Sequence, residues 1–164
     1  MRKRIVGFAG LPLRDRTEIT RFFWLWSFFE GTHLGAEGDE GAIRALAQRW
    51  SRDGHLRQFP FAVEFVYFQN RYFPRGAESR HYVPLNMIRN RRVEPLVRQV
   101  LAGEEATDED TAFALLMVIY RLRNNLVHGP KWAGTFEDQR DNFRHANSVL
   151  KKALELDGRG LLAL

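Results

Sequence analysis

A long apolar stretch in the second half of the chain constrains the fold most. Its apolar residues recur from Ala112 to Leu122, and they predict a helix over residues 108–127, the longest of the apolar helices in this sequence. Gly129 and Pro130 are its expected stop, because glycine favours helix C-termini and proline cannot continue a helix. Acidic residues lie at its start, where the helix dipole favours negative charge.

The rest of the chain also has helical patterns. Asp15 and Glu18 resemble a capping box before a helix over 17–30, and Asp39 is the expected cap of the next helix. The aromatic segment 60–73 fits helical spacing, although its aromatic and β-branched content would also suit a strand. Further helices are predicted over 40–52, 91–102 and 136–156, with a long loop over 74–90. We therefore predict an all-α fold, a helical bundle of about five to six helices in a single domain spanning 1–164.

The helix over 17–30 is apolar nearly all round. It carries five phenylalanine and tryptophan side chains within Phe22–Phe28, and such a helix is buried on more than one side. Two readings follow from this pattern. The helix is either a central core element, or one of its faces meets another subunit.

Charge and composition point to a polyanionic partner. The chain of 164 residues has a net charge of +5, and seven arginines fall between Arg71 and Arg98 against two glutamates. Arginine suits bidentate contacts with phosphate, although the same pattern also fits a solvated arginine-rich surface. The chain has no cysteine, which fits a reducing cytoplasm, and no apolar run long enough for a transmembrane helix. We expect a cytoplasmic protein without a membrane partner.

The segment 121–130, Arg-Leu-Arg-Asn-Asn-Leu-Val-His-Gly-Pro, ends the long apolar helix with side chains that packing does not require. Asparagine is a poor helix former, so two in succession indicate a chemical role. Arginine and histidine together supply a cation and a proton-transfer group for attack on a phosphodiester. On an ideal helix Arg121 lies about 20° from His128, and Arg123 lies about 140° from it. Helix geometry therefore favours Arg121 as the neighbour of His128 within one helix.

The same segment resembles a known family. Residues 123–128, Arg-Asn-Asn-Leu-Val-His, match the motif of the HEPN superfamily, and Gly129 and Lys131 are similar to its common bacterial form. The aromatic segment 21–30 resembles the first helix of Apea-like HEPN domains. The family is all-α, with this motif at the end of one long helix and another long helix following it.

The resemblance implies a metal-independent endoribonuclease that needs no cofactor and acts as a homodimer with a composite site. It implies catalytic roles for Arg123 and His128, with Asn124 as the polar neighbour. We assign RNA contacts to Arg121, Asn125 and Lys131. The remaining histidines are scattered without metal-ligand spacing, so we expect no metal site.

Three functions remain as alternatives. The leading hypothesis is a HEPN ribonuclease with a toxin–antitoxin or phage-defence role. The second is a catalytically inactive HEPN module that binds a protein partner, such as a nucleotidyltransferase-type antitoxin. The third is a helical nucleic-acid-binding protein without catalysis, whose binding would be sensitive to salt.

Overall fold

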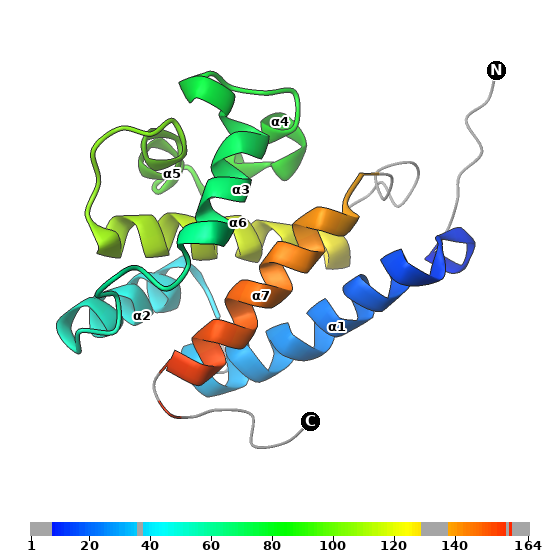
Figure 1. Cartoon of the computed structure of the whole chain (residues 1–164), viewed down its shortest axis with the longest axis horizontal. Coiled ribbons are helices and arrows are strands. Elements are labelled where there is room, and N and C mark those ends of the chain that lie inside the picture. The colour runs from blue at the N-terminus through cyan, green and yellow to red at the C-terminus, as the bar shows by residue number, and fades with distance from the viewer. Residues whose placement is uncertain (1–7, 36–37, 129–137, 157, 159–164) are drawn as a thin grey trace.

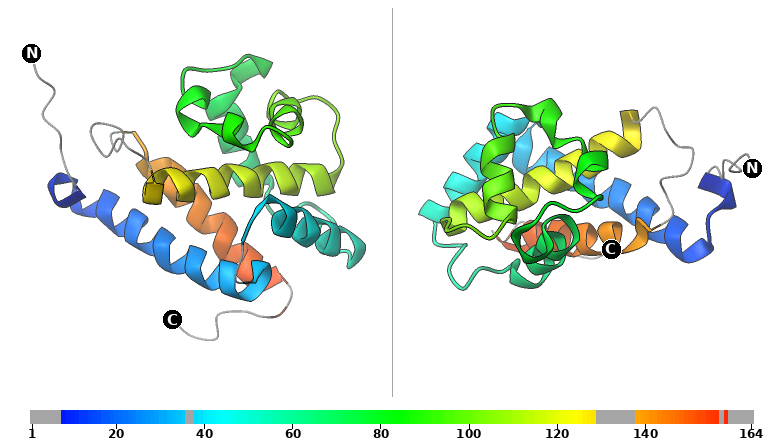
Figure 2. Two further views of the ribbon diagram at one scale, coloured as in Figure 1. Left: turned by 180° about the vertical axis from the view of Figure 1, so that it is seen from behind. Right: turned by 90° about the horizontal axis from the view of Figure 1, so that it is seen from above.

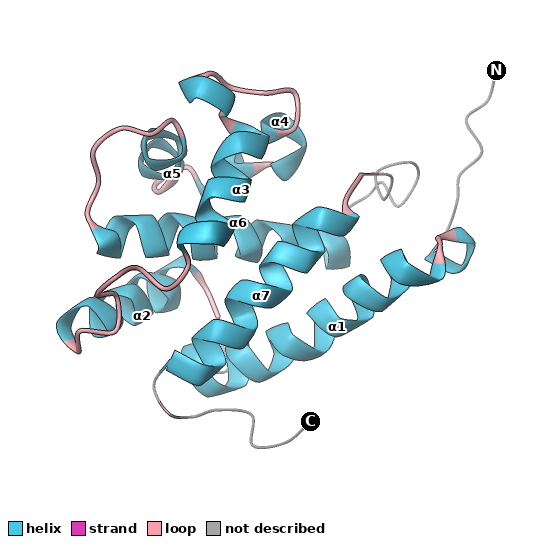
Figure 3. Ribbon diagram, in the orientation of Figure 1, coloured by secondary structure: helices cyan, strands magenta, loops and turns pink. Residues whose placement is uncertain are grey.

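Helices make up the architecture of the computed structural model, which describes residues 8–35, 38–128, 138–156 and 158. No strand occurs in these ranges (Figure 3), so the prediction of an all-α fold is confirmed. The seven α-helices are α1 (Leu13–Phe29), α2 (Glu40–Arg52), α3 (Ala62–Tyr72), α4 (Tyr82–Leu85), α5 (Glu94–Leu101), α6 (Asp108–His128) and α7 (Arg140–Leu156). Short 3₁₀ segments cover Phe8–Gly10, Pro74–Gly76 and Met87–Asn90, and a π-helical turn covers Glu30–Leu34.

Helix α6 runs through the bundle and packs against α2, α4 and α5. In Figure 1, α4 and α5 lie above α6 and α1 and α2 lie below it, whereas α3 and α7 pass in front of it. Its residues 112–119 are buried on every side. Such a run cannot contact water on any helical face, which explains why the segment is apolar throughout. All seven α-helices contribute side chains to the same buried core.

The first and last helices of the bundle pair with each other. Helices α1 and α7 lie side by side in both views of Figure 2 and make the most extensive interhelical contact described. The rings of Phe22 and Phe143 meet edge to face, with centroids 5.1 Å apart. The Asn147 amide donates to the main-chain oxygen of Glu18 at 3.0 Å and to its carboxylate at 2.9 Å.

Helix α3 is fastened to α7 by a buried carboxylate. Glu64 accepts from the Ser148 hydroxyl at 2.5 Å and from the Lys152 ammonium at 2.9 Å. Burial raises the pKa of Glu64, but the hydrogen bonds from Lys152 and Ser148 outweigh it, and the net pKa is lowered. Glu64 therefore has a structural role, joining two helices as an ion.

The six helices expected from the sequence are all present, with shifted ends. The Asp39 carboxylate caps α2 as predicted, accepting from the Ala42 amide at 2.8 Å. The capping box at Asp15 was wrong: α1 begins at Leu13 after Pro12, no side chain caps it, and Asp15 lies in its first turn. A helix needs no side-chain cap when its first backbone amides can donate to water.

The prediction of a long loop over 74–90 was also wrong, because this stretch contains α4 and two 3₁₀ segments. Helix α4 ends at Leu85, and the next residue, Asn86, has the left-handed conformation (φ 59°). A single turn of helix has little stability alone. The carbonyls at its end are held by side chains of α6, a contact between residues far apart in the sequence.

None of the helices in the described ranges combines the length and the apolarity that crossing a membrane requires.

Candidate functional site

The last two turns of α6 present polar side chains to two different surroundings. Arg121 and Asn125 lie one turn apart and face α4. Tyr120, Arg123, Asn124 and Val127 are partly or fully exposed, and we call these four residues the open face of α6. At Tyr120 this face contacts α1, and the centroids of the Tyr120 and Trp26 rings are 6.2 Å apart.

Arg121 has structural contacts within the fold. Its side chain is buried, with 5% of its surface exposed. Nε donates to the main-chain oxygen of Leu85 at 3.4 Å, and Nη2 donates to Oδ1 of Asn125 at 3.1 Å. Nη1 lies 3.5 Å from Oδ1 of Asn90. Burial lowers the pKa of Arg121, and no carboxylate pairs with it among the described residues.

Asn125 completes the attachment of α4. Its amide nitrogen donates to the main-chain oxygens of Pro84 at 3.2 Å and Leu85 at 3.0 Å. These oxygens belong to the last turn of α4, whose carbonyls lack partners within the helix. Arg121 and Asn125 were predicted to contact RNA, and the structure places both against the protein's own backbone.

Arg123 has different surroundings. Its side chain is half-buried on the open face, and Nη1 donates to Oδ1 of the adjacent Asn124 at 3.0 Å. Within the described ranges this is the only hydrogen bond of its guanidinium, and no ion pair involves it. A guanidinium group carries five N–H donors, so this bond uses one of them. Asn124 is also half-buried and orients Arg123 through this bond.

His128 is the last residue of α6, and its side chain lies outside the described part of the structure. Lys131 and the expected stop at Gly129 and Pro130 also lie outside the described residues. The backbone of α6 is helical through 128. Position 128 therefore follows Asn124 by four residues, about one turn further along the same helix.

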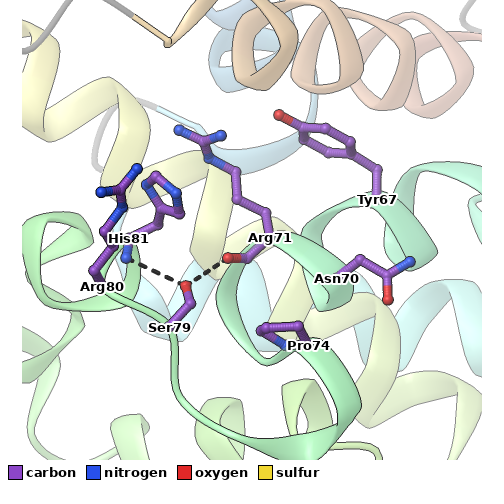
Figure 4. Close-up of a pocket in the computed structure, with 7 residues that line it drawn as sticks. All are labelled: Tyr67, Asn70, Arg71, Pro74, Ser79, Arg80 and His81. Atoms are coloured by element: carbon purple, nitrogen blue, oxygen red, sulfur yellow. Dashed lines mark hydrogen bonds between the residues drawn. The ribbon is translucent and has the colours of Figure 1, made fainter.

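A pocket of about 540 Å³ lies beside the C-terminal end of α3 (Figure 4). We call it the α3–α4 pocket, and it is lined by Tyr67, Asn70, Arg71, Pro74, Ser79, Arg80 and His81. Sequence reasoning missed this site. The arginine-rich stretch contained its cations, but the histidine was read as isolated because only the fold brings Arg71 next to residues 79–81.

Ser79 organises the pocket. Its hydroxyl donates to the main-chain oxygen of Arg71 at 2.6 Å and accepts from the His81 amide at 3.2 Å. Its own amide donates to the main-chain oxygen of Tyr72 at 2.8 Å. These bonds hold the 79–81 turn against the end of α3, so that Arg71, Arg80 and His81 project on the same side of the turn (Figure 4).

The cations of the pocket differ in how they are bound. Arg71 is 11% exposed, and its Nη2 donates to the main-chain oxygen of Asp138 at 2.8 Å and contacts the Asp138 carboxylate at 3.3 Å. Its Nε is buried without a hydrogen-bond partner among the described residues. Arg80 is exposed, and within the same ranges it has no ion pair. Burial and the charges of Arg71 and Arg80 lower the pKa of His81.

The remaining arginines of the 71–98 stretch divide into two groups. Arg98 is neutralised by Glu78 and by Glu94, whose carboxylate lies 2.9 Å from its Nε. The others are exposed and have no ion pair within the described residues: Arg75, Arg89, Arg91 and Arg92. These arginines therefore lie at the surface, and the carboxylates of the described residues pair with only some of them.

Helix α1 has a buried side and an exposed apolar side. One face is buried in the core, as predicted for a central helix. The other exposes Phe23, Trp24 and Phe28, and Trp24 is 64% exposed. Large apolar side chains gathered on one exposed helix mark a surface suited to another protein. We call these three residues the apolar surface of α1.

No group of three or more histidine, cysteine or acidic residues in the described ranges is arranged to hold a metal ion. Comparison with known proteins finds no matching protein family, no matching curated protein and no matching solved structure.

Proposed function

We propose that this protein is an endoribonuclease of the HEPN type, acting as a homodimer in the cytoplasm in a toxin–antitoxin or phage-defence role. One observation carries the proposal. The arginine that matches the motif, Arg123, lies on the open face of α6 and bonds only to Asn124 among the described residues, whereas the competing Arg121 is engaged by α4. The order of the last two long helices, with the motif at the end of the first, also agrees with the family.

The chemistry assigned to these residues is an internal transesterification of RNA. The 2′-oxygen of the ribose bonds to the adjacent phosphorus, and the bond from phosphorus to the 5′-oxygen of the next nucleotide breaks. His128 removes the proton of the 2′-hydroxyl or gives one to the leaving 5′-oxygen. Arg123, oriented by Asn124, stabilises the charge on the phosphorane oxygens. The products are a 2′,3′-cyclic phosphate and a 5′-hydroxyl.

A second copy of the chain enters the proposal because Arg123 and position 128 lie about 140° apart around α6. Two motifs facing each other would let Arg123 of one copy act beside His128 of the other. Tyr120 of the open face of α6 contacts Trp26 on the buried side of α1, and the exposed side of the same helix carries the apolar surface of α1. We propose that the apolar surface of α1 forms part of the dimer interface.

The test is cleavage of a labelled single-stranded RNA by the purified protein in the presence of EDTA. We expect wild type to cut, and Arg123→Ala and His128→Ala to slow cleavage by about 10²- to 10³-fold. Arg91→Ala is the matched control, since it removes the same charge from an exposed site. A wild-type protein that leaves RNA intact, or motif variants that cut as fast as the control, would refute the assignment.

The apolar surface of α1 supports a second candidate function, an inactive HEPN module that binds a protein partner such as a nucleotidyltransferase-type antitoxin. On this alternative the exposed Trp24 would contact the partner rather than a second copy. Co-expression with the product of a neighbouring gene separates the two candidates. A stable complex that depends on Trp24, together with no RNA cleavage, would favour the module.

A further inference from the structure

We propose that the α3–α4 pocket binds a phosphate group of the RNA strand, next to the cleavage site at the end of α6. The inference rests on the proposed function for the identity of its ligand. Its physical basis is separate, because none of the residues that line the pocket belongs to the motif at 121–128.

The charge in the pocket favours an anion. Arg71 and Arg80 contribute two permanent positive charges, and His81 adds a third when it is protonated. The only described carboxylate in contact with these cations is that of Asp138, which contacts Arg71. Asp138 is largely exposed, so water competes with this ion pair and the pair has little net stability. A phosphate can take the place of the Asp138 carboxylate at Arg71.

Arg71 is prepared for such a ligand. Its side chain is held in place by burial and by the bond to the main-chain oxygen of Asp138. Its buried Nε has no hydrogen-bond partner among the described residues. A phosphate oxygen would accept from Nη2 in place of the Asp138 carboxylate, in a charge-assisted hydrogen bond.

The geometry of the fold places the pocket beside the proposed cleavage site. Residues 79–81 lead directly into α4, and the end of α4 is fixed to α6 by Arg121 and Asn125. Arg71 is tied to Asp138, just before α7. Hydrogen bonds thus connect the pocket to the end of α6 through α4 and to the residue just before α7 through Arg71.

The size of the pocket favours a nucleotide of a strand over a free phosphate ion. About 540 Å³ lies in the range of small-molecule pockets, roughly 300–1,000 Å³, and a lone phosphate would leave most of it empty. The exposed Pro74 and Arg80 at its margin leave it open to solvent, so a strand can enter and leave. Single-stranded nucleic acids bind in basic grooves of this kind.

The experiment measures binding without cleavage. A fluorescent single-stranded RNA with 2′-O-methyl groups lacks the attacking hydroxyl, and its dissociation constant is obtained by fluorescence anisotropy over a series of salt concentrations. We expect Arg80→Ala to weaken binding about tenfold and to reduce the salt slope by about 0.7. Arg91→Ala is the matched control and should change affinity by less than about twofold. Asp138→Asn should tighten binding, because it removes the competing carboxylate.

Equal losses for Arg80→Ala and Arg91→Ala would overturn the proposal, since they would indicate a diffuse positive surface. Tighter competition by inorganic phosphate or a mononucleotide than by an unlabelled strand would overturn it too. Arg71→Gln keeps an amide donor at the pocket, and this variant should bind RNA more weakly than wild type, as Arg80→Ala does. Thermal unfolding of Arg71→Gln checks that the variant folds. If wild type fails to cleave ordinary RNA but Arg80→Ala still loses affinity selectively, the phosphate-binding pocket is supported and the proposed nuclease activity is refuted. If wild type cleaves RNA but Arg80→Ala shows no selective loss of affinity, the nuclease activity is supported and the phosphate-binding pocket is refuted.

Discussion

Truncation of two arginines that are two residues apart on α6 is predicted to have different effects on stability. Arg121→Ala should destabilise the fold and Arg123→Ala should leave it almost unchanged. Arg121 is buried and bonded to α4, whereas Arg123 is half-buried and bonded to the side chain of its neighbour. The pair therefore separates a structural role from a functional one.

The magnitude follows from the contacts. Of the three hydrogen bonds of Arg121, only the 3.1 Å bond to Asn125 has an ordinary length, and those at 3.4 and 3.5 Å are weak. A hydrogen bond to a charged group contributes about 1.5–3 kcal/mol, against which stands the cost of burying the guanidinium. Truncation also leaves a cavity and removes a donor from Oδ1 of Asn125. We expect a loss of roughly 2–4 kcal/mol in the free energy of unfolding.

For a chain of this length such a loss lowers Tm by roughly 5–15 °C. Arg123→Ala should change the free energy of unfolding by less than about 0.5 kcal/mol, as for other partly exposed sites. Urea unfolding followed by circular dichroism measures both. Arg121→Met is the informative third variant: it fills the space without the buried charge, and should lose only about 1 kcal/mol. Equal stability for Arg121→Ala and Arg123→Ala would refute the structural role of Arg121.

Three further predictions concern other parts of the bundle. The pKa of Glu64 is lower in the folded state than in the unfolded chain, so its ionisation stabilises the fold above the unfolded pKa of about 4.3 and this contribution is lost as pH falls through the folded pKa. Glu64→Gln should therefore make unfolding less dependent on pH as the pH falls below about 5, and an unchanged pH dependence would argue against the ion pair with Lys152. Asp39→Ala should cost about 1 kcal/mol by removing the cap on the Ala42 amide, Asp39→Ser should recover most of it, and a Tm unchanged by the alanine would exclude the cap. Trp24→Glu should convert the proposed dimer to a monomer in sedimentation velocity while leaving Tm nearly unchanged, because Trp24 is exposed; a variant that stays dimeric would place the interface elsewhere.

Sequence reasoning predicted the helices because their signals are local. The burial of α6 follows from an apolar pattern within one segment, and the cap of α2 follows from Asp39 and its neighbours. Helix α4 was missed for the opposite reason. Its end is held by Arg121 and Asn125, which are about 40 residues away in the chain, and no pattern within 74–90 indicates these bonds.

The candidate site was predictable in its residue types but not in its geometry. Helical angles alone placed Arg121 beside His128 and favoured it over Arg123. The structure shows Arg121 buried against α4, a fact that depends on where α4 folds back. The α3–α4 pocket could not be predicted for the same reason. It depends on the bond from Ser79 to Arg71, which holds the turn between α3 and α4 in place.

The pairing of α1 with α7 has a consequence for the order of events during synthesis. The core-facing side of α1, with Phe22 and Trp26, emerges from the ribosome more than a hundred residues before α7. At typical translation rates its main partner is missing for on the order of ten seconds. The buried core also includes residues of α7, so it is incomplete until this last helix has been made. A nascent chain would thus expose the core-facing side of α1 until α7 pairs with it.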